Sequence, residues 1–155
     1  ENEQAMWAIE SGLFDTLQPA FSILAQRARH GIFQAAKAAN MGIIAKRPIA
    51  NGMWGREFRS EDHYEDTVAR RLGQRAQKMQ AAGPIAGEPD NRIETALGFV
   101  LAHPDVHTAI VGTRNPDHMQ SNIDIVNQQL PIETGVVAQL QRRYDDVGAD
   151  WRSID

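Results

Sequence analysis

The sequence predicts an α/β fold built on three short parallel strands. Strand-like runs occur at about 15–18, 43–46 and 107–111, and segments with apolar residues at helical spacing separate them. Strands that alternate with helices of ten or more residues form βαβ units, in which the strands are parallel. We expect the whole chain, residues 1–155, to form a single domain of this class.

Helical periodicity predicts helices over residues 3–11, 30–41, 61–82, 91–102, 115–128 and about 134–147. The turn-rich stretch 81–91 is expected to be a mobile loop. In the last three helices the predicted inward-facing residues are Ile93, Ala96, Leu97, Val100 and Leu101, then Met119, Ile123 and Val126, and finally Val137, Leu140, Tyr144 and Val147.

Composition excludes several classes of function. The chain has no cysteine, so it forms neither disulfides nor zinc–thiolate sites, and the cytoplasm is the expected compartment. A net charge of −4 without a basic stripe argues against a nucleic-acid surface. No apolar run reaches the roughly 18 residues of a membrane span, and the first residues do not resemble a targeting signal. We therefore expect no nucleic acid and no membrane among its partners.

The stretch AIVGTRNPDHMQSNI, residues 109–123, predicts an anion-binding turn. Its first three residues form a short run that can be buried on both faces, as in a parallel strand under helices. Gly112 allows a sharp turn, and an Asn-Pro pair then opens a helix. The N–H groups of the first helical turn and the guanidinium of Arg114 favour a phosphate. A capped turn with a solvated arginine is the alternative interpretation.

His103 and His107 are four residues apart, a spacing that would let both bind a metal on one helix. Pro104 lies between them and breaks any such helix, so we expect no metal site.

Three blocks of the sequence and its closing helix carry a family resemblance. The blocks are AIESGLFDTLQPAFSIL, AANMGIIAKRPIANGMW and ALGFVLAHPDVHTAIVGTRNPDHMQSNIDIV. In this order they resemble consecutive parts of the aldo-keto reductases, which fold as TIM barrels and reduce carbonyl compounds with NADPH. The resemblance covers the last three βα units and the C-terminal helix. It implies a partial, half-like TIM barrel with three parallel strands and surrounding helices.

The resemblance also implies a cofactor site at the carboxyl ends of the strands. Gln18 matches a glutamine that contacts the nicotinamide amide. Lys46 stands where many members have an aromatic side chain, and with Arg47 it would face pyrophosphate oxygens instead. The other matching positions are Pro48, Ile49 and Asn51 in the pyrophosphate loop, and Gly112, Thr113, Arg114, His118 and Asn122 around the adenosine 2′-phosphate and adenine. The resemblance implies NADP as the cofactor. Better-known members have arginine in place of His118, and this departure keeps NAD as the alternative.

No catalytic residue is expected in this chain. The family's proton-donating tyrosine, and the lysine, aspartate and histidine that assist it, belong to the first four strands. Tyr64 and Tyr144 are predicted in outer helices as packing or surface residues. The expected function is therefore the cofactor clamp of an oxidoreductase for small carbonyl compounds. The alternative is an inactive half-barrel that acts as an oligomeric or binding module.

A parallel sheet of three strands leaves open edges and one uncovered face. The strand count fits a piece of something larger, so we expect a missing N-terminal half or a homo-oligomer, with a two-fold dimer the commonest form. Leu17, Ile44 and Ile110 are candidates for the face that a partner would cover. The alternative is a monomer covered by the loop at 48–60 and the C-terminal tail. Trp54 would then cap the open side, or else line a substrate pocket.

Overall fold

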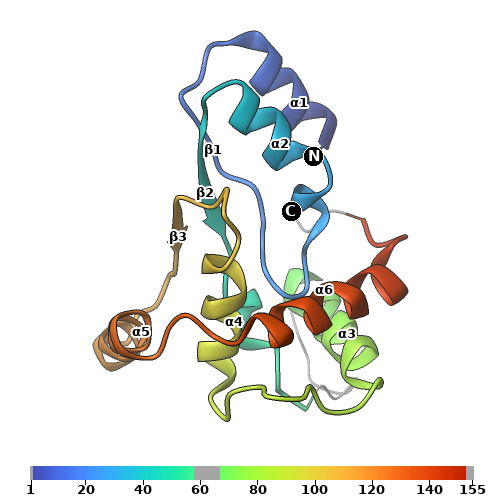
Figure 1. Ribbon diagram of the computed structural model, residues 1–155, viewed down its shortest axis with the longest axis vertical. Coiled ribbons are helices and arrows are strands. Elements are labelled where there is room, and N and C mark those ends of the chain that lie inside the picture. The colour runs from blue at the N-terminus through green and yellow to red at the C-terminus, as the bar shows by residue number, and fades with distance from the viewer. Residues whose placement is uncertain (1, 58–66, 153–155) are drawn as a thin grey trace.

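The computed structural model describes residues 2–57 and 67–152, and it confirms the predicted parallel sheet. Strands β1 (Thr16–Leu17), β2 (Gly42–Lys46) and β3 (Thr108–Ile110) are hydrogen-bonded in the order β1-β2-β3 (Figure 1). Both pairings are parallel, with Leu17 beside Ile43 and Lys46 beside Ile110. The carboxyl ends of the strands therefore lie at one edge of the sheet.

Helices connect and surround the strands. They are α1 (Asn2–Ser11), α2 (Ile32–Ala38), α3 (Thr67–Gln80), α4 (Arg92–Leu101), α5 (Pro116–Gln128) and α6 (Thr134–Gly148), with short 3₁₀ turns η1 (Arg27–Arg29) and η2 (Ala50–Gly52). The beginning of the helix predicted over 61–82 lies outside the described residues. None of the helices in 2–57 and 67–152 combines the length and the apolar composition needed to cross a bilayer.

The sheet has one covered and one open face. In β2, Ile43 and Ala45 are fully buried, whereas Ile44 and Lys46 alternate with them and are only half-buried. Helix α2 contacts β2 and α4 contacts β3. Because Leu17 pairs with Ile43, it lies on the covered side, so the prediction that it shares a face with Ile44 was wrong.

The core lies on the covered side of the sheet. Phe21 is central to it, with ring centroids 4.9 Å from Phe33 and 5.6 Å from Phe99. The polar helix α3 adds a buried stripe of Ala69, Leu72, Ala76 and Met79. In α6 the buried residues are Val136, Leu140, Tyr144 and Gly148; the prediction was wrong for Val147, which is exposed.

The stretch 81–91 is fastened to the rest of the molecule, contrary to the expectation of a mobile loop. The guanidinium of Arg143 in α6 donates hydrogen bonds to the carbonyl oxygens of Met79 (3.2 Å), Gly83 (2.6 Å) and Pro84 (2.6 Å). The buried indole of Trp54 donates to the Glu88 carboxylate at 2.6 Å. Trp54 is thus a core residue, and its role as a cap or as a pocket residue stays a prediction.

The predictions fail most clearly at α5. Met119, Ile123 and Val126 keep 39–45% of their surface exposed, although all three were predicted to face inward. Ile110 in β3 is also 45% exposed, as expected for a residue of the face that a partner would cover. Ile125 is the buried residue of α5, and it lies on a different side of that helix. The periodicity of α5 was read correctly, but nothing in the described chain covers its apolar face.

Candidate functional site

Two of the predicted cofactor residues line the same groove at the carboxyl edge of the sheet. Gln18 directly follows β1, and Lys46 is the last residue of β2. The chain after β1 continues alongside Lys46, whose N–H donates to the Pro19 carbonyl at 3.0 Å. Together with α1, these residues bound an open groove of about 440 Å³. The groove offers a side-chain amide and an ammonium group to a ligand.

The loop that follows β2 is held in an unusual backbone conformation. Arg47, Ala50 and Asn51 have φ values of 57°, 48° and 54°, in the left-handed region that side chains other than glycine adopt at a cost. Short hydrogen bonds fix the loop, among them that from the Gly52 N–H to the Ile49 carbonyl at 2.7 Å. Such strain is concentrated at ligand-binding segments. The Asn51-Gly52 pair is the one sequence feature that favours such a backbone.

The neighbouring predicted residues of this loop differ in accessibility. Pro48 is buried and Ile49 is half-buried, while Asn51 is exposed. Asn51 is therefore the side chain of the three that a bound cofactor can reach most directly.

The turn between β3 and α5 is built as the sequence predicts. The side chain of Asn115 caps α5 by accepting a hydrogen bond from the Asp117 N–H at 2.9 Å, and Pro116 occupies the first turn. The hydroxyl oxygen of Thr113 accepts from the Asn115 N–H at 3.2 Å and so shapes the turn. Gly112 is exposed, and nothing lies within 4 Å of the place where a Cβ would stand.

This turn keeps hydrogen-bond donors available. Within the described residues, the backbone N–H groups of Thr113, Arg114 and His118 have no protein acceptor. The exposed guanidinium of Arg114 forms no ion pair there either. With the positive end of the α5 dipole, these groups suit an anion. Asp117, in the same first turn, is the opposing negative charge.

His118 and Asn122 are not equivalent in the structure. His118 is exposed in the first turn of α5, next to the donors just described. Asn122 lies one turn further and lines a different, largely apolar groove beside β3. The groove that Gln18 and Lys46 line includes no residue of the β3–α5 turn.

Tyr144, the tyrosine that the structure describes, does not suit acid catalysis. Tyr144 is buried against Trp151, with ring centroids 5.4 Å apart, which confirms its expected packing role. Burial raises its pKa above the usual value, the opposite of what proton donation near neutral pH requires. Tyr64 lies outside the described residues.

The two histidines of the HxxxH spacing have separate structural roles. His103 packs edge-on against Phe33, with ring centroids 4.7 Å apart, and burial lowers its pKa. His107 accepts a hydrogen bond from the Ile43 N–H through Nδ1 at 3.0 Å. Among the described residues no group of three or more His, Cys, Asp or Glu side chains is arranged for a metal ion.

Comparison with solved structures supports the fold. The chain superposes on the aldo-keto reductase AKR11C1 from Bacillus halodurans with TM-scores of 0.66 for its holo form and 0.65 for its apo form, at 19% identity in each case. The match covers 88% of this chain but only 45–46% of the bacterial one, so the chain spans about half the length of these structures. Three parallel strands with surrounding helices thus correspond to part of a TIM barrel.

Comparison of sequences identifies the family. No curated protein matches the chain. The family model described as "Aldo/keto reductase family" matches residues 3–142, which is most of the sequence. The chain belongs to the aldo/keto reductase family.

Proposed function

We propose that this chain is the NADP-binding part of a carbonyl oxidoreductase. The observation that carries the proposal is the β3–α5 turn: among the described residues, the N–H groups of Thr113, Arg114 and His118 have no protein acceptor, and the Arg114 side chain is exposed. Arginine forks and helix N-termini are the usual partners of phosphate groups. The 2′-phosphate distinguishes NADP from NAD, and this turn gives the chain a means to bind it.

The rest of the cofactor would lie along the carboxyl edge of the sheet. Gln18 offers an amide to the nicotinamide end, and Lys46 and Arg47 offer positive charge to the pyrophosphate. Asn51 can contribute a further polar contact. When bound, NADPH supplies the hydride; the residues of this chain bind and orient it.

Among the described residues, no tyrosine suits the donation of a proton for carbonyl reduction. Tyr144 is buried with a raised pKa, and no other described tyrosine is present. We therefore infer that a second part, in the same polypeptide or another, supplies the proton donor and most of the site for a small carbonyl substrate.

Calorimetric titration with NADPH and NADH tests the cofactor role. We expect NADPH to bind roughly tenfold more tightly or better, because a charge-assisted hydrogen bond contributes about 1.5–3 kcal/mol. Arg114→Ala should remove this preference, and Asp117→Asn should increase it by removing a like charge near the phosphate. Arg142→Ala is the control, because Arg142 is an exposed arginine on α6. Equal affinities for the two cofactors in the unmodified chain would contradict the proposal.

An assay of NADPH oxidation tests whether this chain alone is a complete enzyme or only the cofactor-binding part of one. The 155-residue chain alone should not oxidise NADPH in the presence of aldehydes above the rate without protein. Turnover that disappears in Arg114→Ala would show that this chain carries its own proton donor. Absence of both turnover and cofactor binding would favour the inactive binding module instead.

A further inference from the structure

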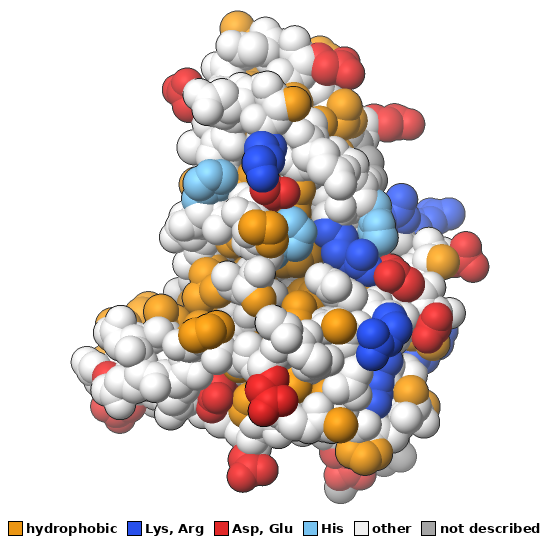
Figure 2. All heavy atoms as spheres, viewed as in Figure 1, with side chains coloured by type: hydrophobic (Ala, Val, Ile, Leu, Met, Phe, Trp, Pro, Cys, Tyr) orange, Lys and Arg blue, Asp and Glu red, His pale blue; other side chains and the backbone are white. Residues whose placement is uncertain are grey.

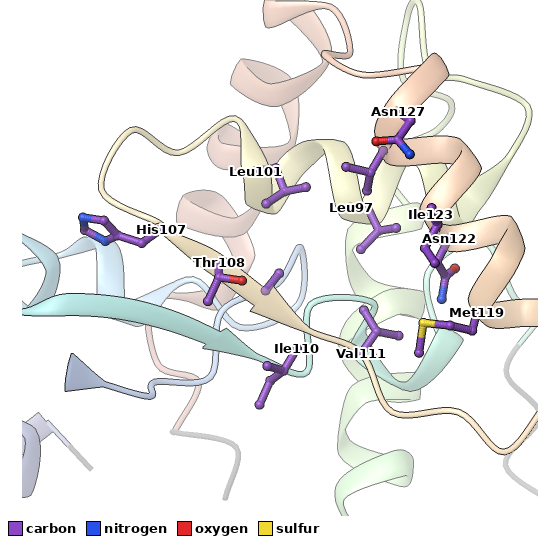
Figure 3. Close-up of a pocket in the computed structure, with 12 residues that line it drawn as sticks. Leu97, Leu101, His107, Thr108, Ile110, Val111, Met119, Asn122, Ile123 and Asn127 are labelled. Carbon is purple, nitrogen blue, oxygen red and sulfur yellow. The ribbon is translucent and has the colours of Figure 1, made fainter.

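Apolar and charged side chains gather on different sides of the molecule. Figure 2 shows hydrophobic side chains beside α5 and several Lys and Arg side chains on the side of α6. A groove of about 580 Å³ beside β3 has an apolar lining that includes Met119, Ile123 and Val126 (Figure 3). A groove of different character, of about 520 Å³, lies between α3 and residues 150–152, which follow α6. We call it the α3 groove.

The α3 groove is lined mainly by positive charge. Four of its lining side chains are cationic, namely Arg71, Arg75, Lys78 and Arg152. Among the described residues that line it, Asp150 is the one carboxylate, and the amides of Gln74 and Gln77 add further hydrogen-bond donors. The groove shares no residue with the one that Gln18 and Lys46 line, or with the β3–α5 turn. A concave surface that carries mostly one sign of charge attracts ions of the opposite sign.

Three of the four cations form a row along α3. Arg71, Arg75 and Lys78 are four and three residues apart, a spacing that places them on one face of the helix. At 1.5 Å per residue the row is about 10 Å long, which is more than a single phosphate group can span. Arg152 adds a fourth charge from the segment after α6. The row therefore suits an anion with several linked phosphate groups better than a single small ion.

Arg75 is built into the wall of the groove. It is 7% exposed, and its guanidinium donates hydrogen bonds to the carbonyl oxygens of Leu24, at 3.0 Å, and of Arg152. The same guanidinium lies 5.0 Å from the centre of the Trp151 ring. The carbonyl oxygen of Trp151 in turn accepts a hydrogen bond from Arg27 at 2.8 Å. These contacts hold the segment after α6 against α3, so both sides of the groove are kept in place.

The charge of Arg75 has no negative partner in the described part of the chain. Within residues 2–57 and 67–152, no carboxylate forms an ion pair with it. Burial lowers the pKa of Arg75 to about 10, and the charges of Arg71 and Arg27 act in the same direction. The carbonyl groups satisfy its N–H donors but carry no net charge, and a buried charge without a counter-ion is costly. A bound anion would reduce this cost.

We propose that the α3 groove binds a small anion with two or more linked phosphate groups, either an inorganic polyphosphate or a nucleoside di- or triphosphate. The arginine side chains offer planar forks to the phosphate oxygens, and Lys78 offers a point charge. Asp150 is the opposing charge. This site lies apart from the proposed NADP contacts and does not depend on them.

Calorimetric titration with sodium tripolyphosphate, pyrophosphate and phosphate tests the proposal. We expect tripolyphosphate to bind most tightly and phosphate most weakly, and we expect added NaCl to weaken binding because it screens exposed charges. Replacement of both exposed cations, Lys78→Gln with Arg152→Gln, should weaken tripolyphosphate binding roughly tenfold. Asp150→Asn should strengthen it several-fold by removing the opposing charge.

A matched control locates the site on α3. Arg70 is an exposed arginine of the same helix that does not line the groove, so Arg70→Gln should leave the affinity for tripolyphosphate unchanged. Equal losses in Arg70→Gln and in the double variant would overturn the proposal. So would the absence of tripolyphosphate binding at millimolar concentration, or phosphate that binds as tightly as tripolyphosphate.

Arg114→Ala separates this site from the proposed cofactor site. It should leave tripolyphosphate binding unchanged. Loss of that binding in Arg114→Ala, with retention in the double variant, would place the phosphates at the β3–α5 turn and overturn the inference. In the Arg114→Ala background, ADP and pyrophosphate distinguish the two sources of linked phosphates. Tighter binding of ADP would identify a nucleotide as the ligand, and equal binding an inorganic polyphosphate; either result supports the site.

Discussion

Helices α4 and α5 are adjacent in sequence and in space, and both carry apolar residues at helical spacing. In α4 every residue from Thr95 to Val100 is buried, because the helix lies between the sheet and the loop before α6. In α5 Ile125 alone is buried among the described side chains, and the apolar stripe faces an open groove. The two helices therefore differ in their surroundings more than in their own sequence pattern.

This difference shows what periodicity measures. An apolar stripe indicates that a helix face is shielded from water in the functional assembly, but it does not indicate which polypeptide shields it. For α4 the covering elements are present, whereas for α5 no element among the described residues covers the apolar stripe. Substitutions of apolar residues should therefore lower the free energy of unfolding strongly in α4 and only slightly in α5.

The largest difference is expected between Phe99→Ala and Ile123→Ala. Phe99 is fully buried beside Phe21, so its truncation should lower the free energy of unfolding by about 3–5 kcal/mol. Ile123 is 45% exposed, and its truncation should cost less than about 1 kcal/mol. Urea denaturation of the isolated chain measures both. Similar losses would show that the α5 face is covered in solution.

A smaller effect is expected from adding a single methyl group to α4. A Cβ at Gly98 would lie 2.5 Å from Cγ2 of Ile132, so Gly98→Ala should destabilise the chain by about 1–3 kcal/mol. Gly135→Ala is the matched control, because nothing lies within 4 Å of its added Cβ in α6. There the higher helix propensity of alanine should stabilise by up to about 1 kcal/mol. Thermal melting that shows the same sign for both variants would contradict the tight contact at Gly98.

The smallest change in the free energy of unfolding is expected from pH, through His103 just after α4. Burial lowers the pKa of His103 below its usual 6.5, so in this range the unfolded chain binds a proton that the folded chain does not. The contribution of His103 to stability is thus present above pH 6.5 and is lost as the pH falls through the folded pKa. Unfolding free energies measured between pH 7.5 and 5.5 should decrease, and less so in His103→Asn. Parallel pH profiles would exclude this role for His103.

The sequence was sufficient for local features and insufficient for those that depend on distant partners. The cap at Asn115 and the parallel pairing of the strands followed from short-range chemistry and from βαβ geometry. The left-handed backbone at Arg47 and Ala50 was not predictable, because neither residue type favours that conformation. The exposure of Met119 and Val126 was missed because burial was inferred from apolarity alone, without knowing which surfaces are present to cover them.

The three hydrogen bonds of Arg143 also have a consequence for the timing of local opening. One guanidinium of α6 satisfies the carbonyl of Met79, near the end of α3, and two carbonyls of the loop beyond it. The end of α3 therefore cannot fray without breaking contacts with α6. Amide protons in these two helices should exchange with solvent deuterium as one cooperative unit, and those of α5 should exchange earlier and independently.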